Sequence, residues 1–593
     1  MPRPSAVLLL AVLAGCASGP AKEPASAASS PLRFSVTLAP GVVVHPVSGG
    51  LLVVLSVKPE GEPREHVSDL DRTAQVFGID VHDLAPGSTA TLDGDVLGYP
   101  IRTLAALPTG PVRVQAVLRL YETFHRADGH IVELPPDRGE GQQWQIAPGN
   151  PASRPVKVDL DPARSGTVTL TLDHVLPPLP PTPDTKYVRH LRIKSELLSR
   201  FWGRDVYLGA LVMVPEGWDT HPRQRYPVVV AQGHFGREFF AWRETPPDPG
   251  LPPADAAGIA RDCPDGHDDL CDIHGYQRVL QEYGWRFHQL WTGPGFPRVL
   301  LVDFQHANPF FDDSYAVNSE TLGPYGDALY KELLPEIERR FRGLGAWARG
   351  TYGGSTGGWE ALAAQLLYPE EFDGVISNCP DPIDFRRLVT VDLYQDTNAY
   401  FSSGPFRTTP RVGSRWALGE TRSTIEQENL KELVLGTRNR SGGQWDIWEA
   451  VFGPVGPDGY PRPLWDKRTG RIDPEAVRYA REHYDLGHIL TRDWATLGAK
   501  LEGKLIEINV GRMDTFFLDG AVERFEERVR ALKDPTPKIT FAYGETDGHC
   551  WSGDRQHINA YSRLTYHERL IPRLVEGWLR NAPPGADVTG WRR

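Results

Sequence analysis

The sequence lacks a surplus of basic residues. Its 593 residues include 64 Lys and Arg against 76 Asp and Glu, a formal net charge of −12 at neutral pH. Binding to the phosphate backbone of a nucleic acid calls for the opposite balance, so no nucleic-acid partner is expected. Hydrophobic residues make up 40% and charged residues 24%, as in soluble, mildly acidic globular proteins. The length predicts two or three domains.

The apolar run at the N-terminus is too short to span a membrane. Residues 6–13 are hydrophobic and follow Arg3, a pattern typical of a secretion signal. Residues 13–16, LAGC, resemble the lipobox of bacterial lipoproteins. This resemblance implies cleavage before Cys16 and acylation of that cysteine. An ordinary signal peptide with an incidental cysteine is the alternative.

Lipidation would divide the N-terminal region into two parts. Residues 1–16 would be the signal peptide, and the Ala-, Ser- and Pro-rich residues 17–31 would form a flexible tether. The protein is then expected to be exported and held on a membrane surface of the bacterial cell envelope. Ala17, in place of an aspartate after Cys16, favours the outer membrane.

Cysteines are scarce. Besides Cys16 there are only four, Cys263, Cys271, Cys379 and Cys550. In an oxidising compartment this even number suggests disulfides. The short polar loop between Cys263 and Cys271 predicts a local bond, which leaves Cys379 and Cys550 as a hypothetical second pair. A less common alternative is a metal site formed by the first two cysteines with His267 and His274. No metal or cofactor is expected.

Residues 32–176 have the pattern of an all-β domain. Apolar residues alternate with polar ones at 112–120 and 167–172, and Gly, Pro and Asp separate the short runs. We expect a β-sandwich of structural or positioning role, with binding of carbohydrate or substrate as the alternative. Prolines at 177–183 predict an extended linker over residues 177–187 before a second domain at 188–593.

The second domain contains a G-x-S-x-G motif, GGSTG, at residues 353–357. A helix-forming run follows it and ends before Pro369. This order is typical of a nucleophile elbow, in which a serine occupies a sharp turn between a strand and a helix. Ser355 is therefore the candidate nucleophile. A glycine-rich turn without chemistry is the alternative, because so short a motif occurs by chance.

Three further regions complete a candidate active site. The loop after the buried strand 228–232 suits an oxyanion hole, with backbone N–H groups of His234 or Phe235 acting beside that of Thr356. Asp514 follows the strand 504–510, and His549 follows the strand 538–543. Ser355, Asp514 and His549 then have the chain order of an α/β-hydrolase triad. Asp519 and His557 are the alternative acid and base.

Several segments together resemble a known family. PVVVAQGHFG, KELLPEIERRF and GGSTGGWEALAAQLLYPEEFDGVIS are similar to the esterase D-like branch of the α/β-hydrolases, which includes feruloyl and acetyl xylan esterases. The resemblance covers about residues 188–380 and 500–580. It departs at Thr356, where many members carry Met, and in the insertion around residues 263–291. Residues 385–500 have no counterpart in a minimal hydrolase, and we expect a helical lid there.

These observations predict a serine esterase that acts on a small-molecule or glycan ester. Its fold would be an α/β-hydrolase with a lid, preceded by the all-β sandwich. Three alternatives remain: an acyltransferase with the same triad, a peptidase, and a non-catalytic glycan-binding surface lipoprotein. The acyl group, the alcohol and the oligomeric state do not follow from the sequence, because they depend on the shape of the pocket.

Overall fold

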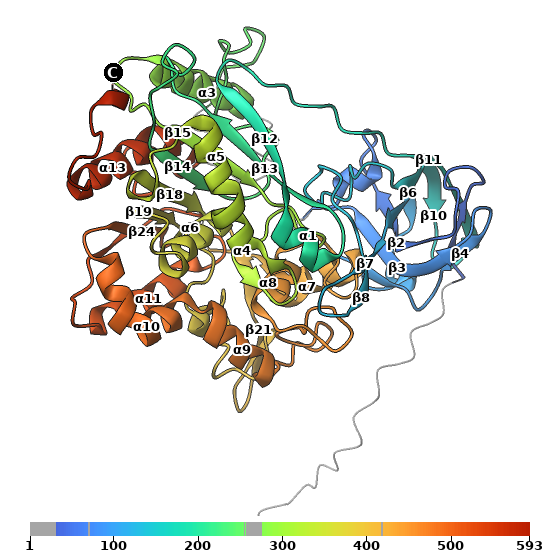
Figure 1. Cartoon of the computed structure of the whole chain (residues 1–593). Helices are drawn as coiled ribbons and strands as arrows, with labels where there is room; N and C mark the ends of the chain where they lie inside the picture. Colours follow the sequence, from blue (N-terminus) through green and yellow to red (C-terminus); the bar gives the residue numbers. More distant parts are fainter. Residues whose placement is uncertain (1–30, 69–71, 254, 256–274, 417–418, 593) are drawn as a thin grey trace, which may run out of the picture.

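The computed structural model describes residues 31–68, 72–253, 255, 275–416 and 419–592. Two large sheets organise these residues (Figure 1). The first belongs to the N-terminal region, coloured blue, and the second lies in the centre of the remaining chain. The predicted signal peptide, tether and Cys16 lie outside the described residues, as do Cys263, Cys271, His267 and His274.

The N-terminal domain is built from short strands, as the alternating pattern predicts. Nine of them join in one sheet, whose main path runs β4-β1-β11-β9-β6-β2-β3-β5, with β10 paired to β6. A separate hairpin joins β7 (Glu122–His125) to β8 (Ile131–Leu134). The bounds of the nine strands are β1 (Arg33–Leu38), β2 (Val47–Ser56), β3 (Gln75–Leu84), β4 (Thr89–Leu92), β5 (Leu97–Tyr99), β6 (Gly110–Leu120), β9 (Pro151–Ser153), β10 (Val156–Leu160) and β11 (Thr167–Val175).

Both faces of this sheet are covered by apolar packing. On one face, side chains from β1, β2, β6 and β11 meet in a single core that includes Phe34, Val53 and Leu172. Neighbours along β2 alternate between the faces, so Leu52 and Val54 belong to a second cluster instead. The strands are linked in one continuous sheet, and its division into the two layers of a sandwich stays a prediction.

Residues 177–187 form no helix or strand, as expected of a proline-rich connector. The second sheet begins directly afterwards and has the order β12-β13-β15-β14-β18-β19-β24-β25. Only β13 is antiparallel to its neighbours, and the strands from β15 to β25 are parallel. Their bounds are β12 (Val188–Ser195), β13 (Val206–Met213), β14 (Val228–Gln232), β15 (Leu300–Gln305), β18 (Arg349–Gly354), β19 (Gly374–Asn378), β24 (Leu505–Gly511) and β25 (Ile539–Gly544).

Helices flank this sheet on both sides (Figure 1). Residues 325–341 form α4 (Tyr325–Ala328), a π-helical turn (Leu329–Leu333) and α5 (Leu334–Phe341). The π turn ends at Leu333, two residues before Pro335, which cannot donate a backbone hydrogen bond. The other helices are α1 (Glu196–Trp202), α3 (Tyr276–Thr292), α6 (Thr356–Leu367), α10 (Leu486–Leu501), α11 (Leu518–Ala531), α12 (Asn559–Ser562) and α13 (Tyr566–Asn581).

The insertion at residues 385–500 contacts the N-terminal domain. It contains two short hairpins, β20 (Phe401–Ser403) with β21 (Thr408–Pro410) and β22 (Val412–Arg415) with β23 (Thr421–Thr424). Its helices are α7 (Ile425–Leu435), α8 (Gln444–Phe452), α9 (Pro474–Tyr484) and the long α10. Apolar side chains of α7 pack on the second face of the N-terminal sheet, among them Leu430, Val434 and Leu435. This packing indicates that the insertion stabilises the contact between the two domains. Its role as a lid remains a prediction.

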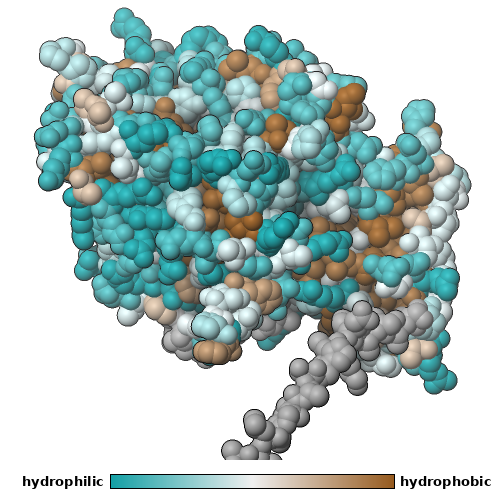
Figure 2. All heavy atoms as spheres, turned by 90° about the horizontal axis from the view of Figure 1, so that it is seen from below, coloured by the Kyte–Doolittle hydropathy of each residue, from teal (hydrophilic) through white to brown (hydrophobic). Residues whose placement is uncertain are grey.

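The surface of the molecule is mixed in character. Figure 2 shows polar side chains over most of one face, with apolar side chains gathered on the side of the N-terminal domain. The exposed apolar side chains of that domain include Val57, Val156 and Val175. Among the described residues, we find no helix with both the length and the apolar character needed to cross a membrane.

The contact between α7 and the N-terminal sheet can be tested at Gly78. A β-carbon at this position in β3 would overlap the carbonyl oxygen of Val434 in α7. Gly78→Ala is therefore expected to push α7 away, lower the melting temperature and make the insertion more susceptible to limited proteolysis. Gly94→Ala is the control, because a β-carbon there meets nothing within 4 Å. Equal behaviour of the two variants would contradict a tight contact.

Candidate active site

Ser355 lies on a strained turn between β18 and α6. Its backbone has φ 58° and ψ −124°, a combination that residues with a side chain rarely adopt. The serine is the last residue before α6, and β18 ends one residue earlier. This is the strand, serine, helix order of a nucleophile elbow, which the motif at 353–357 predicts.

Close packing leaves no space for side chains beside the turn. A β-carbon on Gly357 would overlap the carbonyl oxygen of Gln232 in β14. One on Gly353 would overlap the backbone of Gly357. Glycine at both positions therefore lets α6 approach β14 and β18 closely enough to hold the serine at the end of the sheet.

The structure brings Asp514 and His549 together. Nδ1 of His549 lies 2.9 Å from Oδ2 of Asp514, and both side chains are buried. Phe516 packs edge-on against the imidazole, with ring centres 4.9 Å apart. Burial opposes the charged imidazole, but the neighbouring Cys550 and Asp514 outweigh it and raise the pKa of His549 well above its usual value. Asp514 can thus fix the orientation of the ring and stabilise its cation.

The predicted disulfide between Cys379 and Cys550 is wrong, because both side chains are buried thiols that form no disulfide. Their sulfur atoms and a ring nitrogen of His549 nevertheless lie within 4.8 Å of one another. The sulfur of Cys379 also accepts a hydrogen bond from the backbone N–H of Ser355, at 3.2 Å. These two sulfurs therefore mark the place where the loop carrying the serine meets the loop carrying the histidine. As soft ligands with an imidazole, they could also hold a thiophilic metal ion.

The hydroxyl of Ser355 points to a carboxylate that the sequence analysis did not identify. Its Oγ donates to Oδ1 of Asp381 at 3.2 Å, and the N–H of Asp381 bonds to the carbonyl of Ser355 at 3.2 Å. Asp381 follows β19 by three residues, so it reaches the same edge of the parallel sheet as Ser355 and Asp514. A carboxylate three residues after a strand of the sheet is the feature of the sequence that could have identified it.

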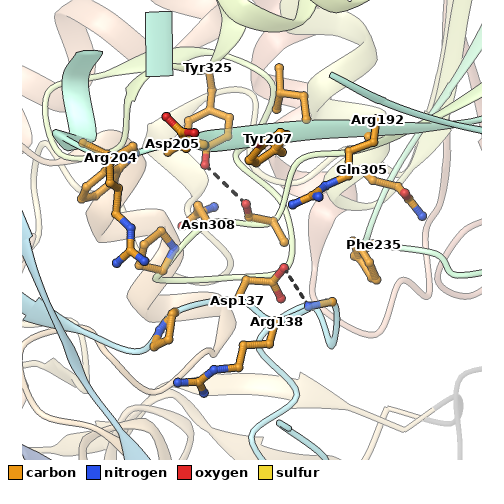
Figure 3. A pocket seen from close by; sticks show the side chains of 18 of the residues that line it. Asp137, Arg138, Arg192, Arg204, Asp205, Tyr207, Phe235, Gln305, Asn308 and Tyr325 are labelled. Atoms are coloured by element: carbon orange, nitrogen blue, oxygen red, sulfur yellow. Dashed lines mark hydrogen bonds between the residues drawn. The ribbon is translucent and has the colours of Figure 1, made fainter. Parts of the chain in front are cut away.

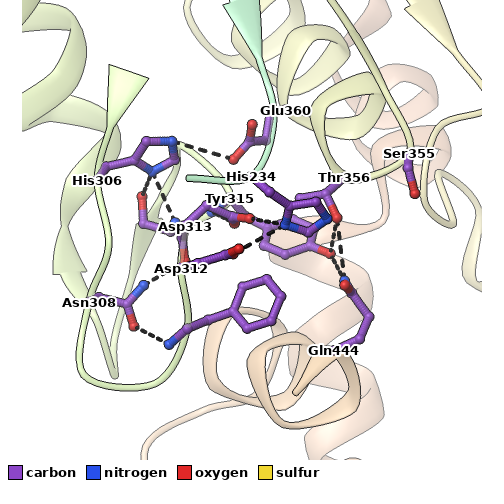
Figure 4. A network of polar contacts seen from close by, with 12 residues as sticks. His234, His306, Asn308, Asp312, Asp313, Tyr315, Ser355, Thr356, Glu360 and Gln444 are labelled. Atoms are coloured by element: carbon purple, nitrogen blue, oxygen red, sulfur yellow. Dashed lines mark hydrogen bonds and ion pairs between the residues drawn. The ribbon is translucent and has the colours of Figure 1, made fainter. Parts of the chain in front are cut away.

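Several donors converge on the other oxygen of Asp381. Oδ2 accepts hydrogen bonds from Tyr315 at 2.5 Å, Thr356 at 3.0 Å and Gln444 at 3.2 Å. Burial raises the pKa of Asp381, and its bonds to Tyr315 and Thr356 oppose that effect. Gln444 comes from α8, so the insertion reaches the serine through this carboxylate. Figure 4 shows Gln444 beside Tyr315 and Thr356, two of the other donors. This contact supports a role of the insertion at the site.

His234 follows β14 and is held by two acids, as Figure 4 shows. Its Nδ1 lies 3.1 Å from Asp312 and 3.0 Å from Asp313, while 47% of the side chain stays exposed. Despite partial desolvation of the ring, both carboxylates raise the pKa of His234 well above its usual value. This group is also a geometric candidate for a metal ion, although a charged imidazole fills the space between the acids. Phe235 follows His234 in the loop.

A second buried pair lies behind this loop. His306 and Glu360 are almost completely buried, and 3.8 Å separates Nε2 of the imidazole from Oε1 of the carboxylate. Burial raises the pKa of Glu360 well above its usual value, and burial lowers that of His306 to about 4. Nδ1 of His306 bonds to Ser314 at 2.8 Å. A protonated Glu360 beside a neutral imidazole avoids the cost of two buried charges.

The alternative acid and base are placed elsewhere. His557 contacts Asp554 at 2.9 Å and does not share the contact between His549 and Asp514. Asp519 lies in the first turn of α11, where burial raises its pKa to about 6 and Arg415 lies 3.8 Å away. Thr356 is the first residue of α6, a position whose N–H has no acceptor within the helix. That N–H is therefore available to a ligand in the way an oxyanion hole requires.

Comparison with known proteins gives distant structural likenesses only. No family model matches the chain, and no curated protein does. Solved structures that match include a ferulic acid esterase, with 13% identity, a TM-score of 0.34, and coverage of 66% of this chain and 98% of that one. An S-formylglutathione hydrolase from Agrobacterium tumefaciens has 13% identity, a TM-score of 0.30, and coverage of 66% and 94%.

A fluorophosphonate-binding serine hydrolase from Staphylococcus aureus has 11% identity, a TM-score of 0.29, and coverage of 65% and 98%. At these values the likenesses assign neither a family nor a function to this chain. The assignment of the site depends instead on its own strand order, turn geometry and hydrogen bonds.

The carboxylate of Asp381 should stabilise the folded site. Asp381→Ala would leave the donors of Tyr315, Thr356 and Gln444 without their acceptor, at a cost of about 3 kcal/mol or more. Asp381→Asn keeps one acceptor oxygen and is expected to cost less. Chemical denaturation monitored by tryptophan fluorescence would compare the variants, because Trp448 adjoins this group. Equal stability of wild type and Asp381→Ala would refute the role.

Proposed function

We propose that this protein is a serine hydrolase that cleaves carboxylic esters. The observation that carries the proposal is the pairing of Asp514 with His549 at the edge of the sheet where the strained turn presents Ser355. The three residues have the chain order Ser, Asp, His that α/β-hydrolases use. The nearby sulfur of Cys379, which contacts the Ser355 N–H and lies close to the imidazole, supports a short separation of nucleophile and base.

In the proposed reaction, His549 removes the proton of Ser355 as Oγ attacks the ester carbonyl. The N–H of Thr356 and an N–H of the loop at His234 or Phe235 stabilise the negative charge on the former carbonyl oxygen. His549 then donates the proton to the leaving alcohol, and an acyl-enzyme forms. It next activates water to release the acid and regenerate the serine. Asp514 orients the imidazole and stabilises its cation throughout.

The bond between Ser355 and Asp381 represents the resting position of the hydroxyl in this proposal. Rotation about the Cα–Cβ bond would transfer Oγ from Asp381 to His549 when substrate binds. Hydrogen bonds of a catalytic site are often incomplete before substrate arrives, so this arrangement is compatible with catalysis. Asp381 would then act as a positioning residue that selects the starting rotamer of the nucleophile.

Export and lipid anchoring at Cys16 complete the proposal, with the hydrolase facing a small-molecule or glycan ester at the cell envelope. The support is the lipobox-like segment at residues 13–16 alone.

A fluorophosphonate probe tests the nucleophile and base directly. We expect one covalent adduct on the wild-type protein by intact mass, because the probe reacts with an activated serine whatever the natural substrate. Ser355→Ala should form none, and His549→Ala should react at least about a thousandfold more slowly. Ser402→Ala, at an exposed position of the insertion, is the control that should retain labelling. An adduct that persists in Ser355→Ala would place the nucleophile elsewhere.

The pH dependence of ester hydrolysis tests the role of Asp514. The neutral form of His549 is the base, so kcat/KM should rise with pH through a pKa above the usual 6.5 of histidine. Asp514→Asn removes a carboxylate that raises this pKa. It should therefore shift the acid limb to lower pH and reduce the rate by about 10⁴-fold.

Asp519→Asn is the matched control, because Asp519 does not contact the imidazole. This substitution should leave both kcat/KM and the acid limb of its pH profile unchanged. If Asp514→Asn left the pH profile unchanged, or if Asp519→Asn greatly reduced the rate of ester hydrolysis, Asp519 would be the triad acid instead of Asp514.

A further inference from the structure

A cavity of about 650 Å³ lies where the N-terminal domain meets the second sheet (Figure 3). Its walls include the loop after β8, the β12 and β13 strands with their connection, the loop after β14 and the loop after β15. This volume is within the range of small-molecule binding sites. Neither the triad nor Asp381 lines it, so the cavity is distinct from the site of the proposed reaction.

The cavity nevertheless shares a wall with the loop expected to stabilise the oxyanion. Phe235 lines it directly. Gln305, another lining residue, donates from Nε2 to the carbonyl oxygen of Gly236 at 2.6 Å. The loop that begins at Asn308 in the wall continues to Asp312 and Asp313, which hold His234. A molecule in the cavity would therefore contact residues that hold the oxyanion loop in place.

Positive charge exceeds negative charge around the cavity. Arg138 and Arg204 share a single carboxylate, that of Glu122, at 3.1 Å and 2.8 Å. Arg192 is exposed and forms no ion pair with any residue that the structure describes; its guanidinium instead lies 3.9 Å from the centre of the Tyr207 ring. Three arginines thus face two lining carboxylates, and Arg192 is the arginine among them with no ion pair to a described residue. Guanidinium groups bind carboxylates in a planar, bidentate manner.

The acids that line the cavity already have partners. Asp205 pairs with Lys194 at 2.7 Å. Asp137 accepts backbone hydrogen bonds from Gly141 at 2.8 Å and Gly139 at 3.2 Å. Neither carboxylate therefore competes strongly with a ligand for the arginines. The ring of Tyr207, 42% exposed and stacked with Arg192, and the ring of Phe235 add flat surfaces suited to the faces of a six-membered ring.

We propose that this cavity is a subsite for a carboxylate-bearing six-membered ring, either a uronic acid residue or an aromatic acid, in a part of the ester substrate remote from the cleaved bond. Arg192 binds the carboxylate with help from Arg204, and Tyr207 supports the ring. The statement that the ligand is part of an ester substrate rests on the proposed esterase function. Binding of a carboxylate in the cavity does not depend on that function. The N-terminal domain then has a recognition role, because Arg138 in its wall comes from that domain.

Titration calorimetry on the full chain tests the subsite without any turnover. The probes are sodium D-glucuronate and sodium benzoate, each paired with a neutral analogue, D-glucose and benzyl alcohol. At least one acid should bind about tenfold or more tightly than its neutral analogue, since the charged hydrogen bonds supply the difference. Preference for glucuronate would identify an acidic sugar, and preference for benzoate an aromatic acid; both results support the proposal.

Two variants and a control locate the binding. Arg192→Gln and Arg204→Gln should each weaken the acid by about tenfold, with melting temperatures close to that of the wild type because both side chains are partly exposed. Arg200→Gln, an exposed arginine of α1 outside the cavity, should have no effect.

Equal binding of acids and neutral analogues, no binding of either acid at millimolar concentration, or unchanged affinity in Arg192→Gln would each overturn the proposal. An absent fluorophosphonate adduct together with normal acid binding would refute the esterase function and leave the carboxylate site in place.

Discussion

The backbone of Ser355 is the constraint on which the candidate site depends. A positive φ at a non-glycine residue costs about 1–3 kcal/mol, so surrounding structure must enforce it. Here the enforcement comes from β14, β18 and α6, which approach so closely that Gly353 and Gly357 have no room for a β-carbon. The order of the parallel strands then brings the loops with Asp381, Asp514 and His549 to the same edge.

The insertion connects this strained turn to the N-terminal domain. At one end, Gln444 of α8 bonds to the carboxylate that holds the serine hydroxyl. At the other, α7 covers the second face of the N-terminal sheet. Between them, Arg440 reaches Asp80 in β3 at 2.8 Å. The insertion therefore connects the N-terminal domain to Ser355 through direct contacts. The N-terminal domain itself contains no candidate catalytic residue.

Local chemistry explains which features could be predicted from the sequence. Ser355, Asp514 and His549 lie beside strong strand patterns, and glycines mark the turn, so short-range rules located them. The patterns at 112–120, 167–172, 228–232, 504–510 and 538–543 also correspond to strands of the two sheets, because runs and alternations of apolar residues mark buried strands. Asp381 was missed because its role is defined by Tyr315, Thr356 and Gln444, which come from three separate segments. Cys379 and Cys550 were predicted to pair because their number suggested disulfides. A count of cysteines does not reveal that the sulfur of Cys379 accepts a hydrogen bond from the backbone N–H of Ser355.

The cavity shows why an N-terminal β domain without catalytic candidates could still influence the chemistry. Binding energy from a remote part of a substrate accelerates a reaction only when it is realised in the transition state. Phe235 and Gln305 place a wall of the cavity against the loop expected to bind the oxyanion. A carboxylate held by Arg192 would brace that loop at the moment when charge develops on the carbonyl oxygen. Arg138, which the N-terminal domain contributes to the same cavity, would add to this recognition, so the domain would affect kcat as well as KM.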